Sequence, residues 1–130
     1  MKAQLVRVRS QNVGMAPDVT IWFNPSCSKC RGARELLEAR GVEAEYVRYL
    51  DEAPSRTEVE RVMGLLGIDD PRAMMRTSEA VYVELGLDDA DRDGLIAAMV
   101  AHPILIERPI IIRGERAVVA RPPERLLELF

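Results

Sequence analysis

With 130 residues, 48% of them hydrophobic, the chain is long enough to bury one core and short enough to form a single domain. No apolar run approaches the roughly 20 residues of a membrane-spanning helix, and the N-terminus lacks a signal peptide's long hydrophobic region, so we expect a cytoplasmic protein without membrane contact. The net charge of -3 gives no general reason to expect nucleic-acid binding.

Residues 1–17 stand apart from the rest of the chain. Residues 5–9 could form a short edge strand, but residues 10–17 have the composition of a linker. We therefore interpret residues 1–17 as an N-terminal extension and residues 18–130 as one domain. This domain opens with residues 18–23, a β-branched and aromatic run that is typical of a buried strand and ends at Asn24-Pro25-Ser26.

The two cysteines of the chain, Cys27 and Cys30, follow this strand. Residues 30–40 carry apolar side chains at helical spacing and precede Gly41, a typical stop signal, so a helix is predicted there. Cys27 then lies at the helix N-terminus, with Cys30 about one turn further along the same face. The C-x-x-C spacing favours a redox or catalytic role, and two ordinary buried cysteines are the alternative. No metal site is expected, because this pair and one histidine do not complete the usual four zinc ligands.

A reactive Cys27 needs help to ionise. A free thiol with a pKa of ~8.5 is about 3% thiolate at pH 7, whereas a pKa of ~6.5 gives roughly 75% thiolate. That shift requires about 2.7 kcal/mol, and a helix terminus supplies ~0.3 to 1 kcal/mol, or up to ~2 kcal/mol when partly buried. Positive side chains must therefore contribute. Lys29 and Arg31 are the local candidates, and arginines from elsewhere in the chain are better ones if the fold brings them in.

A second strand and a helical region come next. Residues 43–50 alternate polar and apolar side chains like a strand, and with the preceding strand and helix they should form a right-handed parallel β-α-β unit. The region from about 55 to 100 is predicted to be mainly helical. Its first helix opens with Ser55 and Glu58 in capping-box spacing.

Two strands and a helix complete the chain. Residues 110–113 and 116–120 should pair as a hairpin, and residues 125–130 as a terminal amphipathic helix. The order β-α-β, helical insertion, β-β-α is that of an α/β thioredoxin-like core with an insert between its halves. In such folds the proline before the third strand lies opposite the reactive cysteine and follows a cis peptide bond, so we expect the Arg108–Pro109 bond to be cis.

Four segments together resemble the signatures of glutaredoxin-linked arsenate reductases, in the family's order and at similar separations. They are Asn24-Pro25-Ser26-Cys27 and the segments 75–80, 102–110 and 121–124. The similarity covers about residues 18–130. It implies that Cys27 is the nucleophile that attacks arsenate. It also implies that Arg76, Arg108 and Arg121 surround the oxyanion.

The implied roles agree with the chemistry. Arsenate is an anion near neutral pH, so the repulsion of an approaching thiolate has to be cancelled. Three guanidinium groups could bind the oxygens, lower the thiol pKa and stabilise the transition state, together with backbone N–H groups at the helix start. A second thiol would then attack the Cys27–arsenic adduct and release arsenite, leaving a disulfide.

Two positions depart from the family pattern. Phe23 stands where arsenate reductases of this type carry a histidine, so arginine must do more of the thiol activation. Cys30 matches the Spx-type regulators and Spx/ArsC-like reductases, and it could resolve the Cys27 adduct as an intramolecular disulfide. No bound cofactor is expected. The reductant would be glutathione with glutaredoxin, or thioredoxin or another dithiol if Cys30 resolves the adduct.

Other polar residues are candidates for supporting roles. Asn24 could cap the helix or orient the nucleophile loop, and Ser28 and Lys29 could contribute helix-start geometry and local charge. Glu107 could pair with Arg108 or be a solvated carboxylate. Two further functions stay open: an Spx-like redox-sensing regulator that binds RNA polymerase, and a thiol-disulfide reductase with another small substrate.

Overall fold

The structure, a computed structural model, describes residues 18–130. The predicted extension 1–17 and the edge strand within it lie outside the described residues. Within residues 18–130, no helix is long and apolar enough to cross a membrane.

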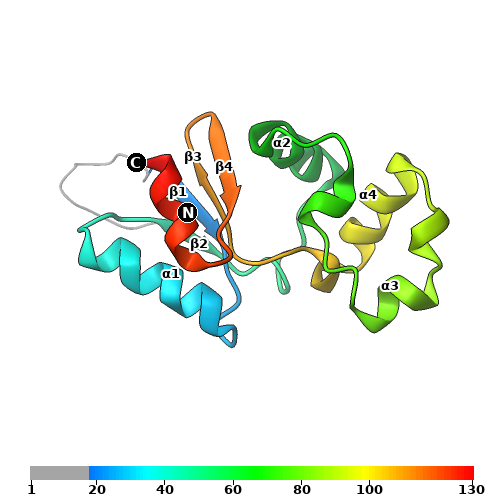
Figure 1. The fold of residues 1–130 in the computed structure, drawn as a ribbon, viewed down its shortest axis with the longest axis horizontal. Coiled ribbons are helices and arrows are strands. Elements are labelled where there is room, and N and C mark those ends of the chain that lie inside the picture. The colour runs from blue at the N-terminus through cyan, green and yellow to red at the C-terminus, as the bar shows by residue number, and fades with distance from the viewer. Residues whose placement is uncertain (1–17) are drawn as a thin grey trace.

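A four-stranded sheet forms the centre of the fold, in the order β2-β1-β3-β4 (Figure 1). The strands are β1 (Val19–Trp22), β2 (Glu45–Val47), β3 (Ile110–Arg113) and β4 (Arg116–Val119). β1 and β2 are parallel, which confirms the predicted β-α-β unit, and β3 pairs antiparallel with both β1 and β4, which confirms the hairpin. The central strands β1 and β3 bury apolar side chains on both faces, since each face of the sheet is covered by helices.

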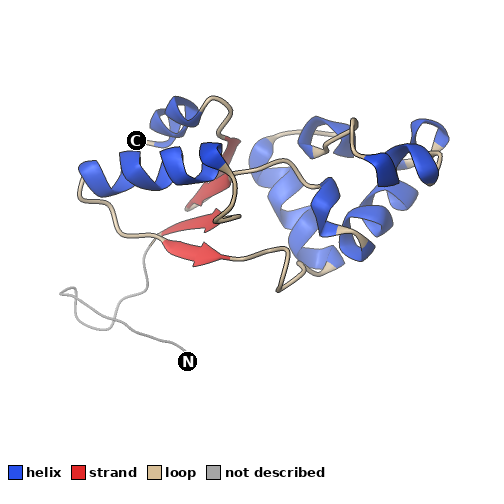
Figure 2. Ribbon diagram, turned by 90° about the horizontal axis from the view of Figure 1, so that it is seen from below, coloured by secondary structure: helices blue, strands red, loops and turns tan. Residues whose placement is uncertain are grey.

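One face of the sheet packs against α1 (Ser28–Ala39) and η4 (Pro123–Leu129), a 3-10 helix at the C-terminus. Figure 2 shows both helices on the same side of the strands. Alternate strand residues, Ile21 and Ile111, point into this core. The terminal helix was expected over residues 125–130 as an amphipathic helix; it begins earlier and is a 3-10 helix.

The opposite face packs against the helical insert, as the burial of Trp22, Ile110 and Ile112 in the second core indicates. The insert consists of α2 (Arg56–Leu66), η1 (Pro71–Met74), α3 (Ala80–Glu84), η2 (Leu87–Asp89), α4 (Arg92–Ala101) and η3 (Pro103–Leu105). The predicted capping box of α2 is confirmed. The Glu58 amide donates to Ser55 Oγ at 3.1 Å, and the Ser55 amide donates to Glu58 Oε1 at 3.0 Å.

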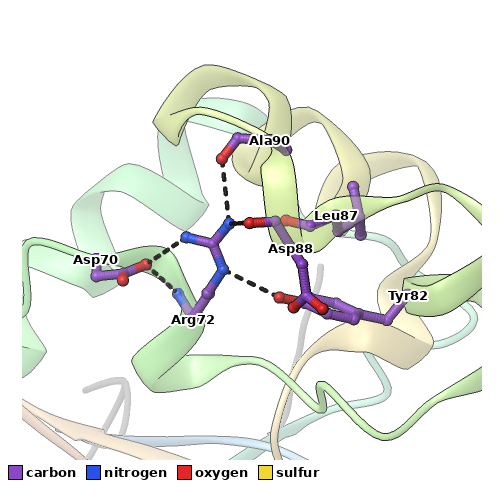
Figure 3. Close-up of polar contacts among 6 residues, drawn as sticks. All are labelled: Asp70, Arg72, Tyr82, Leu87, Asp88 and Ala90. Atoms are coloured by element: carbon purple, nitrogen blue, oxygen red, sulfur yellow. Dashed lines mark hydrogen bonds and ion pairs between the residues drawn. The ribbon is translucent and has the colours of Figure 1, made fainter.

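Arg72 ties the insert together (Figure 3). Its Nε donates to the Tyr82 hydroxyl on α3 at 3.0 Å, and its Nη1 lies 3.4 Å from Asp70 Oδ1. Its Nη2 donates at 2.7, 3.0 and 3.1 Å to three backbone carbonyl oxygens, those of Leu87, Asp88 and Ala90. A single guanidinium group therefore joins η1 to the following two helices, α3 and η2, and the segment that carries Arg76 lies between η1 and α3.

Candidate active site

The site lies at one edge of the sheet, because four chain segments reach that edge. Trp22 at the end of β1 pairs with Ile110 at the start of β3, and Ile110 pairs with Val119 at the end of β4. β2 runs parallel to β1 and ends at the same edge. The segments that carry Cys27, Arg108 and Arg121 therefore meet there, although they are far apart in the sequence.

The nucleophile loop is held by its own hydrogen bonds. The Cys27 amide donates to the Asn24 carbonyl at 3.0 Å, and the Ser26 amide donates to Asn24 Oδ1 at 2.9 Å. Cys27 is the N-cap residue of α1, with extended backbone angles. The Asn24 side chain thus organises the loop and does not cap the helix, which distinguishes between the two roles expected for it.

The Cys27 thiol is buried, with 8% of its surface exposed, yet its pKa is lowered. Burial has the largest effect and raises the pKa. Hydrogen bonds to the sulfur from the amides of Cys30 and Lys29 and from the Arg108 and Cys30 side chains act in the other direction and together outweigh it. The helix start and one guanidinium group therefore favour the thiolate.

Cys30 has the opposite character. It is fully buried, and burial raises its pKa to about 12; the neighbouring Cys27 acts in the same direction. The Asn24 amide donates to its Sγ at 3.4 Å. Both cysteines are free. At neutral pH the pair is consequently asymmetric, with Cys27 poised to ionise and Cys30 held as a thiol that donates to the Cys27 sulfur.

Arg108 is the arginine that acts on the nucleophile, because hydrogen bonding from its side chain is one cause of the lowered Cys27 pKa. Its Nε is the only fully buried side-chain nitrogen or oxygen atom within residues 18–130 that lacks a hydrogen-bond partner. A buried cationic donor without a partner is costly to keep unless a ligand satisfies it. The Arg108–Pro109 bond that follows is cis, as predicted, and Arg121–Pro122 is also cis.

Arg76 and Arg121 are joined by one carboxylate. Glu107 Oε1 lies 3.8 Å from Arg76 Nε and 4.0 Å from Arg121 Nε. Arg76 also pairs with Glu79, and Arg121 Nη1 donates to the Arg108 carbonyl at 3.0 Å. The expectation that Glu107 pairs with Arg108 or stays unpaired in solvent was therefore wrong, because Glu107 contacts the other two arginines.

The remaining predicted residues lie near the loop but take smaller parts. Ser28 and Lys29 are exposed in the first turn of α1, and Lys29 acts on Cys27 through its backbone amide. Arg31 Nη1 donates to the Pro25 carbonyl at 3.1 Å. Lys29 and Arg31 were the local candidates for activating the thiol, but the guanidinium group that lowers the Cys27 pKa is that of Arg108.

Tyr49 also lies near these groups, although it was not identified as a candidate residue from the sequence. It is 1% exposed, and burial raises its pKa to about 12, while the charges of Arg108, Cys30, Cys27 and Arg76 also act on it. A usable signal existed in the sequence. Tyr49 stands at the end of the second predicted strand, and the carboxyl ends of parallel strands share a sheet edge.

No group of three or more His, Cys, Asp or Glu that could hold a metal ion occurs within the described part of the chain. The groups that the site does provide are a thiol with a lowered pKa, a guanidinium group and backbone amides, a combination that suits an anionic electrophile.

Comparison with known proteins agrees with this chemistry. The profile of the ArsC family matches residues 22–129. The chain belongs to the ArsC family. A relative named arsenate reductase, from Neisseria meningitidis, is 45% identical over 112 residues, covering 85% of this chain and 96% of the relative. A protein with the same name from Haemophilus influenzae is 43% identical over 114 residues, covering 86% and 98% of the two chains.

Solved structures extend the comparison to three dimensions. A structure described as arsenate reductase from Vibrio cholerae matches with a TM-score of 0.86 and 44% identity, covering 89% of this chain and all of that one. The predicted thioredoxin-like α/β fold is confirmed as the fold of these ArsC-family proteins. None of these findings favours the Spx-type regulator. The span of the ArsC match includes Cys27, Cys30 and the three arginines.

Proposed function

We propose that this protein reduces arsenate to arsenite, with the Cys27 thiolate as nucleophile. One observation carries the proposal: the pKa of the buried Cys27 thiol is lowered in part by the Arg108 side chain, and the buried Nε of Arg108 has no hydrogen-bond partner. Family membership and relatives named arsenate reductase support arsenate as the anion.

In the first step the Cys27 thiolate attacks arsenic. The thiolate, dihydrogen arsenate and one proton from solvent give the cysteine–arsenate adduct, HO3As–S–Cys27 with one negative charge, and one water. A sulfur–arsenic bond forms and an arsenic–oxygen bond breaks, with no change of oxidation state. Arg108, Arg76 and Arg121 bind the oxygens and offset the charge that the thiolate brings, which is electrostatic stabilisation of the transition state.

In the second step a thiol attacks the Cys27 sulfur. We assign this role to Cys30, whose side chain already donates a hydrogen bond to Cys27. A sulfur–sulfur bond forms, the sulfur–arsenic bond breaks, and its electron pair stays on arsenic, so arsenic(V) leaves as arsenite carrying the Cys30 proton. Two thiols are oxidised to one disulfide, which balances the two-electron reduction.

The disulfide must then be reduced from outside. A Cys27–Cys30 disulfide suits a dithiol such as thioredoxin, whereas attack by glutathione on the adduct, followed by glutaredoxin, bypasses Cys30. Both routes need reduced thiols, which the cytoplasm maintains, so we place the protein there. Asn24, Ser28, Lys29 and Arg31 support the reaction by shaping the loop and the helix start that face the oxyanion.

The test measures arsenite formed by purified protein, with thioredoxin in one series and glutathione plus glutaredoxin in another. Cys27→Ser should abolish turnover in both series. Cys30→Ser should abolish turnover with thioredoxin. The matched control is Arg125→Ala, which removes an exposed arginine paired with Glu128 on η4 and should behave as wild type.

Each outcome has a definite meaning. No arsenite from the wild type in either series, while Cys27 remains titratable, refutes arsenate reduction. Full turnover of Cys30→Ser with thioredoxin removes Cys30 from the second step and leaves the first step intact. Arg76→Ala and Arg108→Ala should each lower kcat/KM at least about tenfold, which corresponds to about 1.4 kcal/mol.

A further inference from the structure

Tyr49 lies at the active-site edge of the sheet because it follows β2, whereas the three arginines lie on other segments of the chain. It stands two residues after the end of β2 at Val47, and β2 is parallel to β1. The ladder between them continues past the strand end, because the Phe23 amide donates to the Val47 carbonyl at 2.8 Å. The Tyr49 segment and the Cys27 loop therefore leave the sheet as neighbours.

The Tyr49 ring is fixed by packing. It is 1% exposed and belongs to the core of the helical insert, together with Met75 and Ile106. These two residues form an isolated antiparallel bridge, and each precedes a charged residue of the site, Arg76 and Glu107. A rigid ring in this core holds its hydroxyl in one place, which is what a substrate contact requires.

The Tyr49 hydroxyl lies close enough to charged groups of the site for them to act on its pKa, and it stays protonated. Burial has the largest effect on its pKa, and the charges of Arg108, Cys30, Cys27 and Arg76 act on it as well. Because its pKa is about 12, the phenol is neutral at physiological pH. It is therefore a neutral donor on which the charges of two arginines and two cysteines act, and its proton is available to an anion.

We propose that Tyr49 is a catalytic residue that donates a hydrogen bond from its hydroxyl to an oxygen of the oxyanion bound between Cys27 and Arg108. This inference rests on the proposed function. Tyr49 keeps its proton throughout, and the proton that converts the leaving oxygen to water comes from solvent. The hydrogen bond strengthens as thiolate charge is transferred to the oxygens, so it favours the transition state over free arsenate.

A neutral donor adds something that a fourth arginine would not. A neutral hydroxyl stabilises the negative charge that develops on the oxygens. Because it carries no positive charge, it does not further stabilise the free thiolate, and Cys27 keeps its nucleophilicity. The expected contribution is that of one hydrogen bond to a charged group, about tenfold or more in rate or affinity.

The test uses two tyrosine-to-phenylalanine variants, each lacking one hydroxyl. Tyr49→Phe removes the proposed donor and keeps the ring that fills the core. Tyr46→Phe is the matched control from the same segment. The Tyr46 ring packs edge-on against Phe23 with 5.1 Å between centroids, and its pKa responds to burial, Glu38 and Arg34.

Three quantities are compared. They are the arsenate concentration that half-protects Cys27 from alkylation by iodoacetamide in a Cys30→Ser background, the kcat/KM for arsenite formation, and the pH midpoint of alkylation without arsenate. Tyr49→Phe should raise the half-protecting concentration and lower kcat/KM, each about tenfold. The alkylation midpoint should stay in place. Tyr46→Phe should match the wild type in all three.

Wild-type protection and turnover in Tyr49→Phe overturn the inference. So does a shift of the alkylation midpoint that accounts for the whole loss, because Tyr49 then acts through the thiol. The protection assay needs no turnover, which separates this inference from the proposed function. If the wild type forms no arsenite, yet arsenate protects Cys27 and Tyr49→Phe weakens that protection, the Tyr49 role stands and arsenate reduction fails. No protection in the wild type overturns both.

Discussion

Replacing Arg108 by methionine is the sharpest perturbation of the Cys27 thiolate. Methionine retains a long, flexible side chain, but it cannot donate the hydrogen bond that Arg108 makes to the Cys27 sulfur. The backbone amides of Cys30 and Lys29, which also lower the Cys27 pKa, are left in place. The variant therefore isolates the guanidinium contribution from that of the helix start.

The size of the effect follows from the contact. A hydrogen bond that involves a charged group contributes about 1.5 to 3 kcal/mol. Since Arg108 is only partly buried, solvent screening favours the lower end of this range. About 1.4 kcal/mol corresponds to one pKa unit, so the Cys27 pKa should rise by about one unit in Arg108→Met. In Arg108→Lys, which keeps a cationic donor, the Cys27 pKa should rise by less.

The assay is the rate of alkylation of Cys27 by iodoacetamide as a function of pH. Cys30 does not interfere, because burial raises its pKa to about 12 and shields it from the reagent. The midpoint of the profile should move upward in Arg108→Met. An unchanged midpoint would show that the amides alone set the Cys27 pKa and would refute the assignment of Arg108 to thiol activation.

Three further predictions concern stability. Tyr82→Phe removes the acceptor of Arg72 Nε and should cost about 1 kcal/mol in urea unfolding; no loss would mean that the carbonyl acceptors suffice. Ser55→Ala breaks the capping box of α2 and should lower the free energy of unfolding in urea by about 1 kcal/mol. An unchanged unfolding midpoint would show that the capping box does not contribute to stability. Cys30 has its pKa raised from 9.0 to about 12, so its burial as a thiol stabilises the fold below pH 9 and this contribution is lost as pH rises towards 12. Cys30→Ala should therefore flatten the fall of Tm over that range, and an equally steep fall would contradict the raised pKa.

Local patterns in the sequence predicted most elements because their causes are local. The capping box at Ser55 and Glu58 is a spacing of side chains with one partner each, and it forms as expected. The C-terminal helix differed for a local reason that was overlooked. Its buried side chains, Leu126 and Leu129, are three residues apart, which fits the three-residue turn of a 3-10 helix.

The arrangement of charges at the site could not be predicted in the same way. The three arginines follow from the family resemblance, but their partners depend on how three distant segments meet. Glu107 is adjacent to Arg108 in sequence, yet its carboxylate lies between Arg76 and Arg121. In the sequence pattern alone, Tyr49 is one apolar position of a predicted strand. Its place near the site follows only from the rule that the carboxyl ends of two parallel strands share a sheet edge.

The Glu107 contacts link two parts of the molecule that have separate cores. Arg76 belongs to the helical insert, and Arg121 follows the last strand, next to the core beneath α1. Local unfolding of either part would separate the arginines while the other part stayed folded. The complete site thus exists only in molecules in which both parts are folded. The free energy of local unfolding of the less stable part sets the fraction of such molecules. Hydrogen exchange at Arg76 and at Arg121 would identify which of the two parts limits it.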